Sequence, residues 1–285
     1  MRDAIKKIID DYNPKNKEEA KYALREIVQY MVLIGLSKAG FFKKGSFYGG
    51  TALRTLYGLN RYSEDLDFTL NTKESDFSII NYMASIEEVA KSYGLNIEVK
   101  VKTKTIKTPI ESAFAKLNTY EALITLKESS EIIREIDKDE KLKIKFEVDT
   151  EPALGFIAET KWIDLPEFAP IVVLDLPSLF AGKIHAIISR NYKNNVKGRD
   201  YYDFLFFIKK KVKPNLKYLR EKLIGSKVIR ETEDFDIDLV KKLLKERIAV
   251  TDFDQVRYDI KRFLIEQEDL SFYSKELFLA MIERI

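Results

Sequence analysis

Apolar residues near the start of the chain recur every three or four positions, which is the spacing of one face of an α-helix. The residues on this face are Ala23, Ile27, Met31 and Ile34. The pattern predicts helices over residues 1–12 and 17–39. A further helix is expected over residues 75–93, because Gly94 follows it and glycine readily adopts the left-handed conformation that closes many helices.

Two later segments alternate strictly between apolar and polar residues, as strands do when one face of a sheet is buried. In the first, residues 95–104, the apolar positions are Leu95, Ile97, Val99 and Val101, and the polar positions are Glu98, Lys100, Lys102 and Lys104. In the second, residues 142–149, Ile144, Phe146 and Val148 alternate with Lys143, Lys145, Glu147 and Asp149. Both segments predict a sheet with one packed face and one face open to water.

Pro166, Pro170 and Pro177 separate these segments from a second region with helical spacing. The helices expected there cover residues 177–190, 200–212, 214–224, 237–249 and 253–284. We therefore predict an α+β fold, with a mixed β-sheet domain and N-terminal helices over residues 1–165 and a helical C-terminal domain over residues 166–285.

Composition narrows the chemistry that the protein can perform. The 285-residue chain contains no cysteine and a single histidine, His185, which excludes thiolate metal sites and multi-histidine zinc sites. A metal ion would have to be bound by oxygen ligands, which suits Mg²⁺ or Mn²⁺. The net charge is only +3, which argues against a chain coated for non-specific nucleic-acid binding. No apolar stretch approaches the length of a membrane span, so we expect a cytoplasmic protein without a membrane partner.

The segment from Gly49 to Phe68, GGTALRTLYGLNRYSEDLDF, concentrates the candidate chemistry. Asp65 and Asp67 stand two residues apart in an expected strand, so both carboxylates point to the same face, with Cα atoms about 6–7 Å apart. That spacing suits a pair of divalent cations about 3.5–4 Å apart, as in two-metal phosphoryl transfer. The glycine pair lets the backbone approach a phosphate, and the N–H groups that open the next helix, near Thr51, can bind it.

Each of these pieces also has an ordinary interpretation. Two acidic residues at alternate strand positions are often merely solvated, and a glycine pair is often a turn. Thr51 could simply be the capping residue of a helix. The order of glycine pair, short helix and paired aspartates is much rarer than its parts.

In this order the residues resemble the first motif of the nucleotidyltransferase fold shared with DNA polymerase beta. In detail they are similar to the AbiEii/AbiGii (MenT-like) toxins of type IV toxin–antitoxin and abortive-infection systems, which carry Gly-Gly-(Ser or Thr)-Ala-Leu-Arg and then Ser-Glu-Asp-x-Asp-Phe. Those toxins also carry an Ala-x-Lys-x-x-Ala helix and a Lys-x-Arg-Asp-x-x-Asp segment. Here these stand at residues 181–186 and 197–203, and the match covers roughly residues 45–208.

The resemblance implies a metal-dependent nucleotidyltransferase toxin. It implies that Asp65 and Asp67 hold Mg²⁺ (or Mn²⁺) and the nucleotide triphosphate, and that Lys183 and Asp200 complete the active site. Gly49, Gly50 and Thr51 are then expected at the phosphates. It further implies transfer of nucleotides from an NTP to an RNA acceptor, the 3′ end of tRNA, with release of pyrophosphate, and a separately encoded antitoxin.

Four site residues keep two interpretations. Ser63 matches an active-site serine of the related toxins, or it hydrogen-bonds the strand edge. Arg54, on the helix after the glycines, could reach a phosphate or pair with Glu64. Without the resemblance, Lys183 would be read as a solvated lysine and Asp200 as a helix cap.

The resemblance to the polymerase-beta fold also implies a third carboxylate for the metal from a neighbouring strand, and the strand over residues 142–149 can supply it. Glu147 and Asp149 share its polar face, and we favour Asp149 because it lies nearer the strand end; a solvated face of alternating charges is the other interpretation. A basic run, Lys209–Lys213 with Lys217, is either an RNA-backbone patch or a set of helix-terminal cations.

Two other functions are open at this point. A kinase or a protein-modifying transferase would use the same metal pair with a different acceptor. A non-catalytic nucleotide-binding regulator would keep the fold without the reaction. The intact pair of Asp65 and Asp67 argues against the regulator, because a binding protein has little need for two carboxylates aimed at one point.

Overall fold

The computed structural model describes residues 2–102, 108–126, 130–190 and 196–285. The α-helices are α1 (Arg2–Tyr12), α2 (Lys17–Lys38), α3 (Gly49–Tyr57), α4 (Met83–Ser92), α5 (Thr119–Thr125), α6 (Ser130–Arg134), α7 (Leu176–Ser189), α8 (Gly198–Lys209), α9 (Leu216–Gly225), α10 (Ile237–Ala249), α11 (Phe253–Lys261) and α12 (Lys275–Ile282). The strands are β1 (Gly45–Tyr48), β2 (Leu66–Leu70), β3 (Glu98–Val101), β4 (Ile110–Asn118), β5 (Lys141–Asp149), β6 (Ala158–Ile163) and β7 (Ala169–Leu174). Short 3₁₀ helices lie at Phe41–Lys43 and Ile79–Tyr82.

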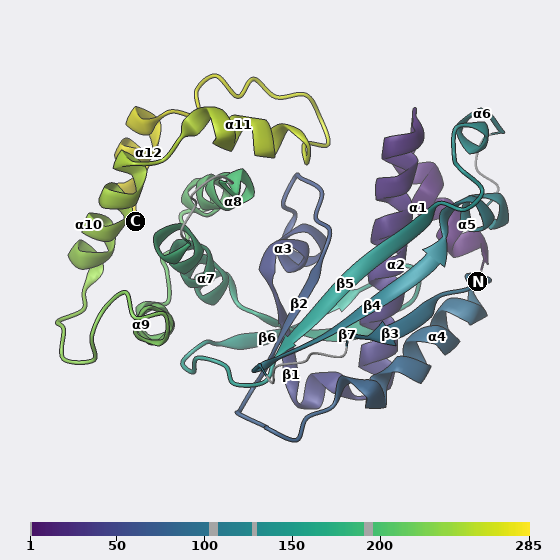
Figure 1. Cartoon of the computed structure of the whole chain (residues 1–285), viewed down its shortest axis with the longest axis horizontal. Coiled ribbons are helices and arrows are strands. Elements are labelled where there is room, and N and C mark those ends of the chain that lie inside the picture. Colours follow the sequence, from purple (N-terminus) through teal and green to yellow (C-terminus); the bar gives the residue numbers. More distant parts are fainter. Residues whose placement is uncertain (1, 103–107, 127–129, 191–195) are drawn as a thin grey trace. The chain divides into compact units, whose positions relative to one another are not determined.

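The chain forms two compact units, whose elements are labelled in Figure 1. Unit 1 consists of Met1–Ala52, Glu64–Pro152 and Thr160–Val173, and unit 2 consists of Leu53–Ser63, Ala153–Glu159 and Leu174–Ile285. The chain first passes from unit 1 to unit 2 within α3 and returns just before β2.

Unit 1 is built on a seven-stranded mixed sheet with the strand order β3-β4-β5-β2-β1-β7-β6. Strand β2 pairs antiparallel with β1 and parallel with β5, and β1 pairs parallel with β7. Strands β3, β4 and β5 pair antiparallel in succession. Strand β2 therefore lies inside the sheet, where its backbone is hydrogen-bonded on both sides.

The two faces of this sheet differ in the way that the alternating pattern predicts. Phe47, Phe68 and Phe146, on β1, β2 and β5, share one face and are fully buried. Helix α2, which packs against β5 and α4, covers this apolar face (Figure 1). On the other face of β5, Lys143 is exposed and Lys145 is half-buried. Because successive strand residues point to opposite sides, the aromatic rings form the core while the lysines reach water.

Helices α2 and α4 approach each other closely at Gly35. A Cβ atom at Gly35 would lie 2.6 Å from Cα of Ile86 on α4, which is closer than such atoms pack. Ser85 Oγ also donates a hydrogen bond of 2.9 Å to the carbonyl oxygen of Gly35. The close approach of the two backbones therefore requires glycine at this position.

Unit 2 is mainly helical. Helix α7 packs against α8, α9 and α10, helix α11 packs against α8, and α10 packs against α12. Buried aromatic rings fill the space between them. The rings of Phe180 on α7 and Phe207 on α8 stack with centroids 4.6 Å apart, and Tyr201 meets Phe278 edge to face at 5.4 Å.

The helices differ from the sequence expectations mainly at their ends. The helix expected over residues 253–284 is two helices, α11 and α12. Ser274 starts the second one, because its side chain accepts a hydrogen bond from the backbone N–H of Leu277. The helix expected over residues 75–93 begins later, as α4, after a 3₁₀ turn.

Among the strands, β3 is shorter than expected, and β1, β4, β6 and β7 were not predicted. The expected strand covered residues 95–104, of which Lys104 lies outside the described residues. Strand β3 is at the edge of the sheet, so Val101, expected to face inward, is 36% exposed. The buried face of β4 is built from small residues such as Ala113 and Ala115, and alanine is depleted in strands, so the segment carries little strand signal.

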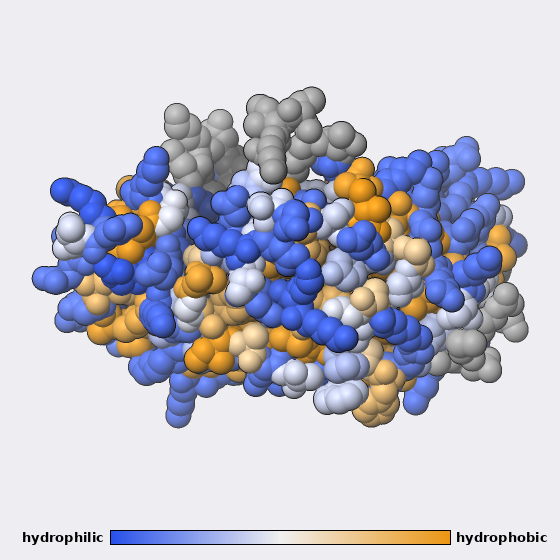
Figure 2. All heavy atoms as spheres, turned by 90° about the horizontal axis from the view of Figure 1, so that it is seen from below, coloured by the Kyte–Doolittle hydropathy of each residue, from blue (hydrophilic) through white to orange (hydrophobic). Residues whose placement is uncertain are grey.

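On the face shown in Figure 2, hydrophobic residues lie in separate patches among hydrophilic ones. Among the exposed apolar side chains, Trp162 and Phe168 contact each other with ring centroids 6.2 Å apart. No helix of the described residues combines the length and the apolar character that spanning a bilayer requires.

Replacing Gly35 by alanine is expected to lower the free energy of unfolding by about 1–3 kcal/mol, because the new Cβ overpacks the contact between α2 and α4. Gly182→Ala is the matched control: it lies on α7, where a Cβ would meet nothing within 4 Å. Alanine is the better helix former, so Gly182→Ala should raise the free energy of unfolding by up to about 1 kcal/mol. Chemical denaturation of both variants checks the pair, and an unchanged midpoint for Gly35→Ala would show that the helices can move apart at little cost.

Candidate active site

Strand β1 runs directly into helix α3, and Gly49 makes the turn. Its φ angle is +87°, a conformation that side chains disfavour. A Cβ atom at Gly49 would also lie 2.6 Å from Oδ2 of Asp67. Glycine is therefore needed here for two reasons, and it lets the first turn of α3 lie directly beside the Asp67 carboxylate.

Asp67 stands on β2 between two neighbours on the polar face of the sheet. It is paired with Tyr48 of β1 and with Glu147 of β5. The carboxylate of Glu147 accepts a hydrogen bond of 2.8 Å from Ser112 Oγ and forms an ion pair of 2.6 Å with Lys145 Nζ. The strand register thus places a second carboxylate next to that of Asp67.

Asp149, which the sequence favoured as the third carboxylate, is paired with Thr69. Its Oδ1 atom accepts a hydrogen bond of 3.1 Å from the backbone N–H of Glu151. The register of the two strands separates Asp149 from Asp67. Strands β2 and β5 run parallel with Glu147 beside Asp67, so Asp149 lies two residues further along β5. The register therefore favours Glu147, although the choice between the two carboxylates stays a prediction.

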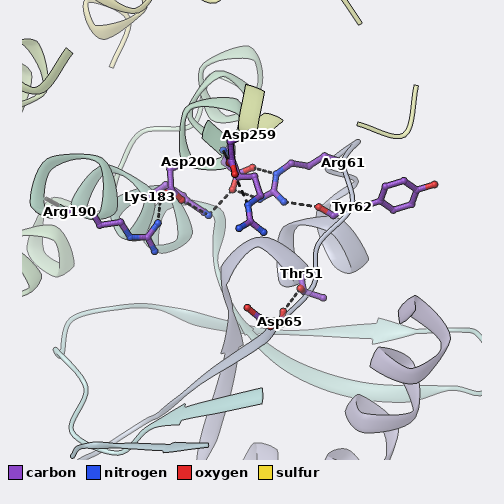
Figure 3. Close-up of polar contacts among 10 residues, drawn as sticks. Thr51, Arg61, Tyr62, Asp65, Lys183, Arg190, Asp200 and Asp259 are labelled. Carbon is purple, nitrogen blue, oxygen red and sulfur yellow. Dashed lines mark hydrogen bonds and ion pairs between the residues drawn. The ribbon is translucent and has the colours of Figure 1, made fainter. Parts of the chain in front are cut away.

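Asp65 is exposed and precedes β2, which begins at Leu66. Two buried side chains hold the segment that carries it. Thr51 Oγ1 donates a hydrogen bond to the carbonyl oxygen of Asp65, as Figure 3 shows, and Gln29 Nε2 donates one of 3.2 Å to the carbonyl oxygen of Glu64. The Thr51 hydroxyl is thus bound to the backbone of the aspartate segment, and the expected contact of the Thr51 backbone N–H with a phosphate stays a prediction.

Ser63 and Arg54 belong to the segment of unit 2 that precedes these residues. Ser63 is buried and lies before the start of β2. Arg54 lies on α3 and donates a hydrogen bond of 3.3 Å from Nη1 to the carbonyl oxygen of Leu59. It stays a prediction that these two residues, and Gly50 in the first turn of α3, contact a nucleotide.

The second group of predicted residues lies within unit 2. Lys183 projects from α7, and its Nζ atom lies 3.1 Å from Asp200 Oδ1 and 2.7 Å from Asp203 Oδ2, both on α8. Arg190 Nη1 binds the other carboxylate oxygen of Asp200, and Figure 3 shows Arg190, Lys183 and Asp200 pointing toward one another. The structure therefore brings Lys183 and Asp200 together in one charged cluster.

Asp200 lies inside α8 and is not its first residue. The N-cap position of α8 is Lys197, whose side chain makes no capping hydrogen bond. The carboxylate of Asp200 is buried and binds two cations, Lys183 and Arg190. Its role is therefore more than that of a helix cap.

Asp203, to which the sequence analysis gave no role, is the most buried member of this cluster. Arg61 donates to both of its carboxylate oxygens, from Nε and Nη2, at 2.7 Å each. Burial would raise the pKa of Asp203, but the charges of Arg61 and Lys183 hold that pKa below its ordinary value. Arg61 and Asp203 stand 142 positions apart in the sequence, so no local pattern could have paired them.

His185 lies on α7, with Nε2 3.1 Å from Oγ of Ser226. Burial lowers the pKa of His185 to about 4, and the nearby charges of Lys222 and Arg190 act in the same direction. The imidazole is therefore neutral at neutral pH, and we assign no acid–base chemistry to it.

The residues around β2 provide the oxygen donors that hard divalent cations prefer. Asp65 and Asp67 supply carboxylates, and Glu147 is the strand neighbour of Asp67. Across residues 2–102, 108–126, 130–190 and 196–285, no three acidic or histidine side chains come close enough together to form a complete metal cluster. Two carboxylates nevertheless suit Mg²⁺ or Mn²⁺, since such ions commonly take water and substrate phosphate as their other ligands.

A mixed sheet that carries paired aspartates beside a glycine-initiated helix is the arrangement of a nucleotidyltransferase. The family model of the nucleotidyl transferase AbiEii toxin of type IV toxin–antitoxin systems matches residues 32–270. The chain belongs to this family of toxins and is a nucleotidyltransferase.

Solved structures of similar fold agree with this assignment. JHP933 from Helicobacter pylori is 18% identical with a TM-score of 0.53, over 92% of this chain and 90% of that chain. MenT4, a nucleotidyltransferase toxin from Mycobacterium tuberculosis, is 15% identical with a TM-score of 0.52, over 99% of both chains. At these identities the likeness concerns the fold, and it confirms the predicted fold class. None of the curated proteins compared with the chain matches it.

Gly49→Ala and Gly58→Ala test the close approach at Asp67. Both glycines have a positive φ, +87° and +77°, but a Cβ at Gly58 would meet nothing within 4 Å. Each variant should lose about 1–2 kcal/mol of stability from the left-handed backbone. Only Gly49→Ala also displaces the Asp67 carboxylate, so only this variant should bind NTP more weakly, on the order of tenfold, or 1.4 kcal/mol. Thermal unfolding and titration with labelled NTP check both expectations. Equal NTP affinities of the two variants would show that NTP binding does not depend on the position of the Asp67 carboxylate.

Proposed function

We propose that this protein transfers a nucleotide from an NTP to the 3′ end of an RNA, with tRNA as the acceptor, in a metal-dependent reaction that releases pyrophosphate. The observation that carries the proposal is the close approach of the Gly49 backbone to the Asp67 carboxylate. It puts a helix start, which binds anions, directly beside a carboxylate that binds cations, and a metal-bound nucleotide triphosphate needs both.

In this reaction the triphosphate lies at the first turn of α3. The backbone N–H groups of Gly49, Gly50 and Thr51, which open this helix, donate to the phosphates. Asp65 and Asp67 would hold a divalent cation on the polar side of the sheet. When bound, that cation would supply charge neutralisation at the phosphates and would orient the triphosphate.

Lys183 acts on the charge that develops during transfer. The hydroxyl oxygen of the RNA end forms a bond to the α-phosphorus, the bond from this phosphorus to the bridging oxygen breaks, and pyrophosphate leaves with the electron pair. The hydroxyl proton passes to solvent. The ammonium group of Lys183 stabilises the negative charge of the transition state, and Asp200 holds that ammonium group in place. Alignment of the reacting groups supplies much of the remaining rate.

The family is one of type IV toxin–antitoxin systems. We therefore include in the proposal a separately encoded antitoxin that opposes the toxin, and an RNA target in the cytoplasm.

Asp65→Asn and Asp67→Asn are expected to abolish transfer with little change in thermal stability, because Asp65 is exposed and Asp67 lies on the polar face of the sheet. Glu147→Gln and Asp149→Asn, measured side by side, rank the candidates for a third carboxylate. The register predicts the larger loss for Glu147→Gln. Initial rates with labelled NTP and melting curves check all four, and near-normal transfer by Asp65→Asn would contradict the assignment of Asp65 as a metal ligand.

Position-specific labels distinguish this function from its rivals. Purified protein is incubated with total RNA, Mg²⁺ or Mn²⁺, and each NTP labelled at either the α- or the γ-phosphate. Label from the α-phosphate on RNA is the expected result. Label from the γ-phosphate on RNA or protein would identify a kinase, and α-label on protein a protein-modifying transferase. Binding without transfer would identify a nucleotide-binding regulator.

We place part of the RNA acceptor on the basic run Lys209–Lys213. Lys209 ends α8, Lys210 follows it, and both line a surface pocket of about 780 Å³ within unit 2. Phe206 and Phe272 line the same pocket, and Phe272 is 50% exposed. An exposed aromatic ring beside lysines suits single-stranded RNA, whose bases stack on the ring while its phosphates bind the cations.

Replacing Lys209, Lys210 and Lys211 together by glutamine is expected to weaken tRNA binding and to flatten its salt dependence. Each lost phosphate contact removes about one unit from the slope of log affinity against log salt. Phe272→Ala should weaken binding without changing that slope, because it removes stacking and no charge. The affinity for free NTP should stay as it is in all of these variants. Titrations of labelled tRNA and labelled NTP at several salt concentrations measure each effect.

The control for this experiment is a charge-matched set on the polar face of the sheet, Lys100, Lys116 and Lys143 to glutamine. This set should leave the salt dependence unchanged. If it flattens the slope and the first set does not, the RNA crosses the sheet instead. If neither set has an effect, a protein acceptor becomes the better hypothesis.

A further inference from the structure

Five charged side chains form one cluster within unit 2, and Figure 3 labels four of them. They are Arg61, Lys183, Arg190, Asp200 and Asp203. Three positive and two negative charges leave the cluster with a formal charge of +1. Its exposure is graded, because the side chains of Asp203 and Arg61 are 0% and 2% exposed, that of Lys183 is 15% exposed and that of Arg190 is 48% exposed.

Lys183 keeps one donor for a ligand. An ammonium group has three N–H donors. Among the residues that the structure describes, Nζ of Lys183 donates a hydrogen bond to the carboxylate of Asp200 and forms an ion pair with that of Asp203. The remaining N–H, on a side chain that still reaches solvent, is available to an anion, and the excess positive charge of the cluster favours one there.

The carboxylate of Asp203 is held in a fixed orientation. Arg61 binds both of its oxygens at 2.7 Å, and a planar guanidinium group fixes the plane of a carboxylate that it binds in this way. The guanidinium is itself anchored, since its Nη1 donates a hydrogen bond of 2.9 Å to the carbonyl oxygen of Tyr62. Asp203 Oδ2 therefore approaches Lys183 from one defined direction.

We propose that Asp203, locked by Arg61, is a positioning residue for Lys183. It fixes the direction in which the ammonium group offers its remaining N–H to a nucleotide phosphate. This proposal rests on the proposed function, in which Lys183 stabilises phosphate charge. The alternative role is purely structural, with the ion pair joining the Leu53–Ser63 segment to α8.

Arg61→Lys distinguishes the two roles when it is combined with Lys183→Ala. Lysine keeps a positive charge beside Asp203 but cannot bind both oxygens in a fixed plane. With Lys183 present, Arg61→Lys should lower the single-turnover transfer rate at saturating NTP by about tenfold, because the ammonium group loses its alignment. In the Lys183→Ala background it should cause no further loss, since the residue through which it acts is gone.

The outcomes of this four-protein comparison are distinct. Equal fold losses in both backgrounds would overturn the positioning role while leaving the role of Lys183 intact. If Lys183→Ala does not lower the rate, the role of Lys183 in the proposed function fails, and the positioning role fails with it. Arg199→Lys is the matched control, because Arg199 of α8 forms an arginine–aspartate pair outside the five-residue cluster, at 3.8 Å from Asp259, and it should keep the rate.

A second variant guards against misfolding as the explanation. Arg61→Met with Asp203→Leu removes both buried charges together, and buried ion pairs often tolerate this exchange for apolar residues without loss of stability. The double variant should melt close to the parent protein and still transfer slowly. A double variant that melts normally and transfers at the full rate would overturn the proposal.

Discussion

The two-residue period of β2 is the constraint on which the candidate site depends. Phe68 points into the core, where its ring stacks on that of Phe47 with centroids 5.1 Å apart, while Asp67 points to the polar face. A slip of one residue in strand register would bury Asp67 and expose Phe68. The packing of the core therefore holds the carboxylate in place, and the same register brings Glu147 beside it. Gly49 adds the helix start, because only glycine leaves room next to Asp67.

A different constraint operates in unit 2, where charges are buried. Asp203 has no exposed surface, and a carboxylate in such a place stays ionised only if cations bind it. Arg61 and Lys183 supply those cations: Arg61 donates hydrogen bonds of 2.7 Å to both carboxylate oxygens, and Lys183 forms an ion pair of 2.7 Å. Removing either partner would leave an uncompensated charge in the interior. The ion pairs that stabilise the buried charge of Asp203 therefore also hold Lys183 in place.

The sequence predicts those features that a short stretch of chain determines. The alternation over residues 142–149 became β5, with its lysines and acids on the polar face, and the helices expected over 177–190 and 200–212 appear as α7 and α8. The two-residue alternation of a strand placed Glu147 and Asp149 on one face. It could not tell which of them lies beside Asp67, because that depends on the pairing of two distant strands. Strand β4 was missed for a local reason, since its alanines carry little strand signal.

Residues that hold the site in place are harder to find than residues of the motifs. Gln29 binds the backbone of Glu64 across 35 positions, and Arg61 binds Asp203 across 142, so neither pair leaves a pattern in the sequence. Lys183 shows why this matters for function. On an isolated helix it would be an ordinary solvated lysine, with no preferred direction for its ammonium group. Only the folding of α8 against α7 brings two carboxylates to it, and that tertiary contact turns a common side chain into one with a defined orientation.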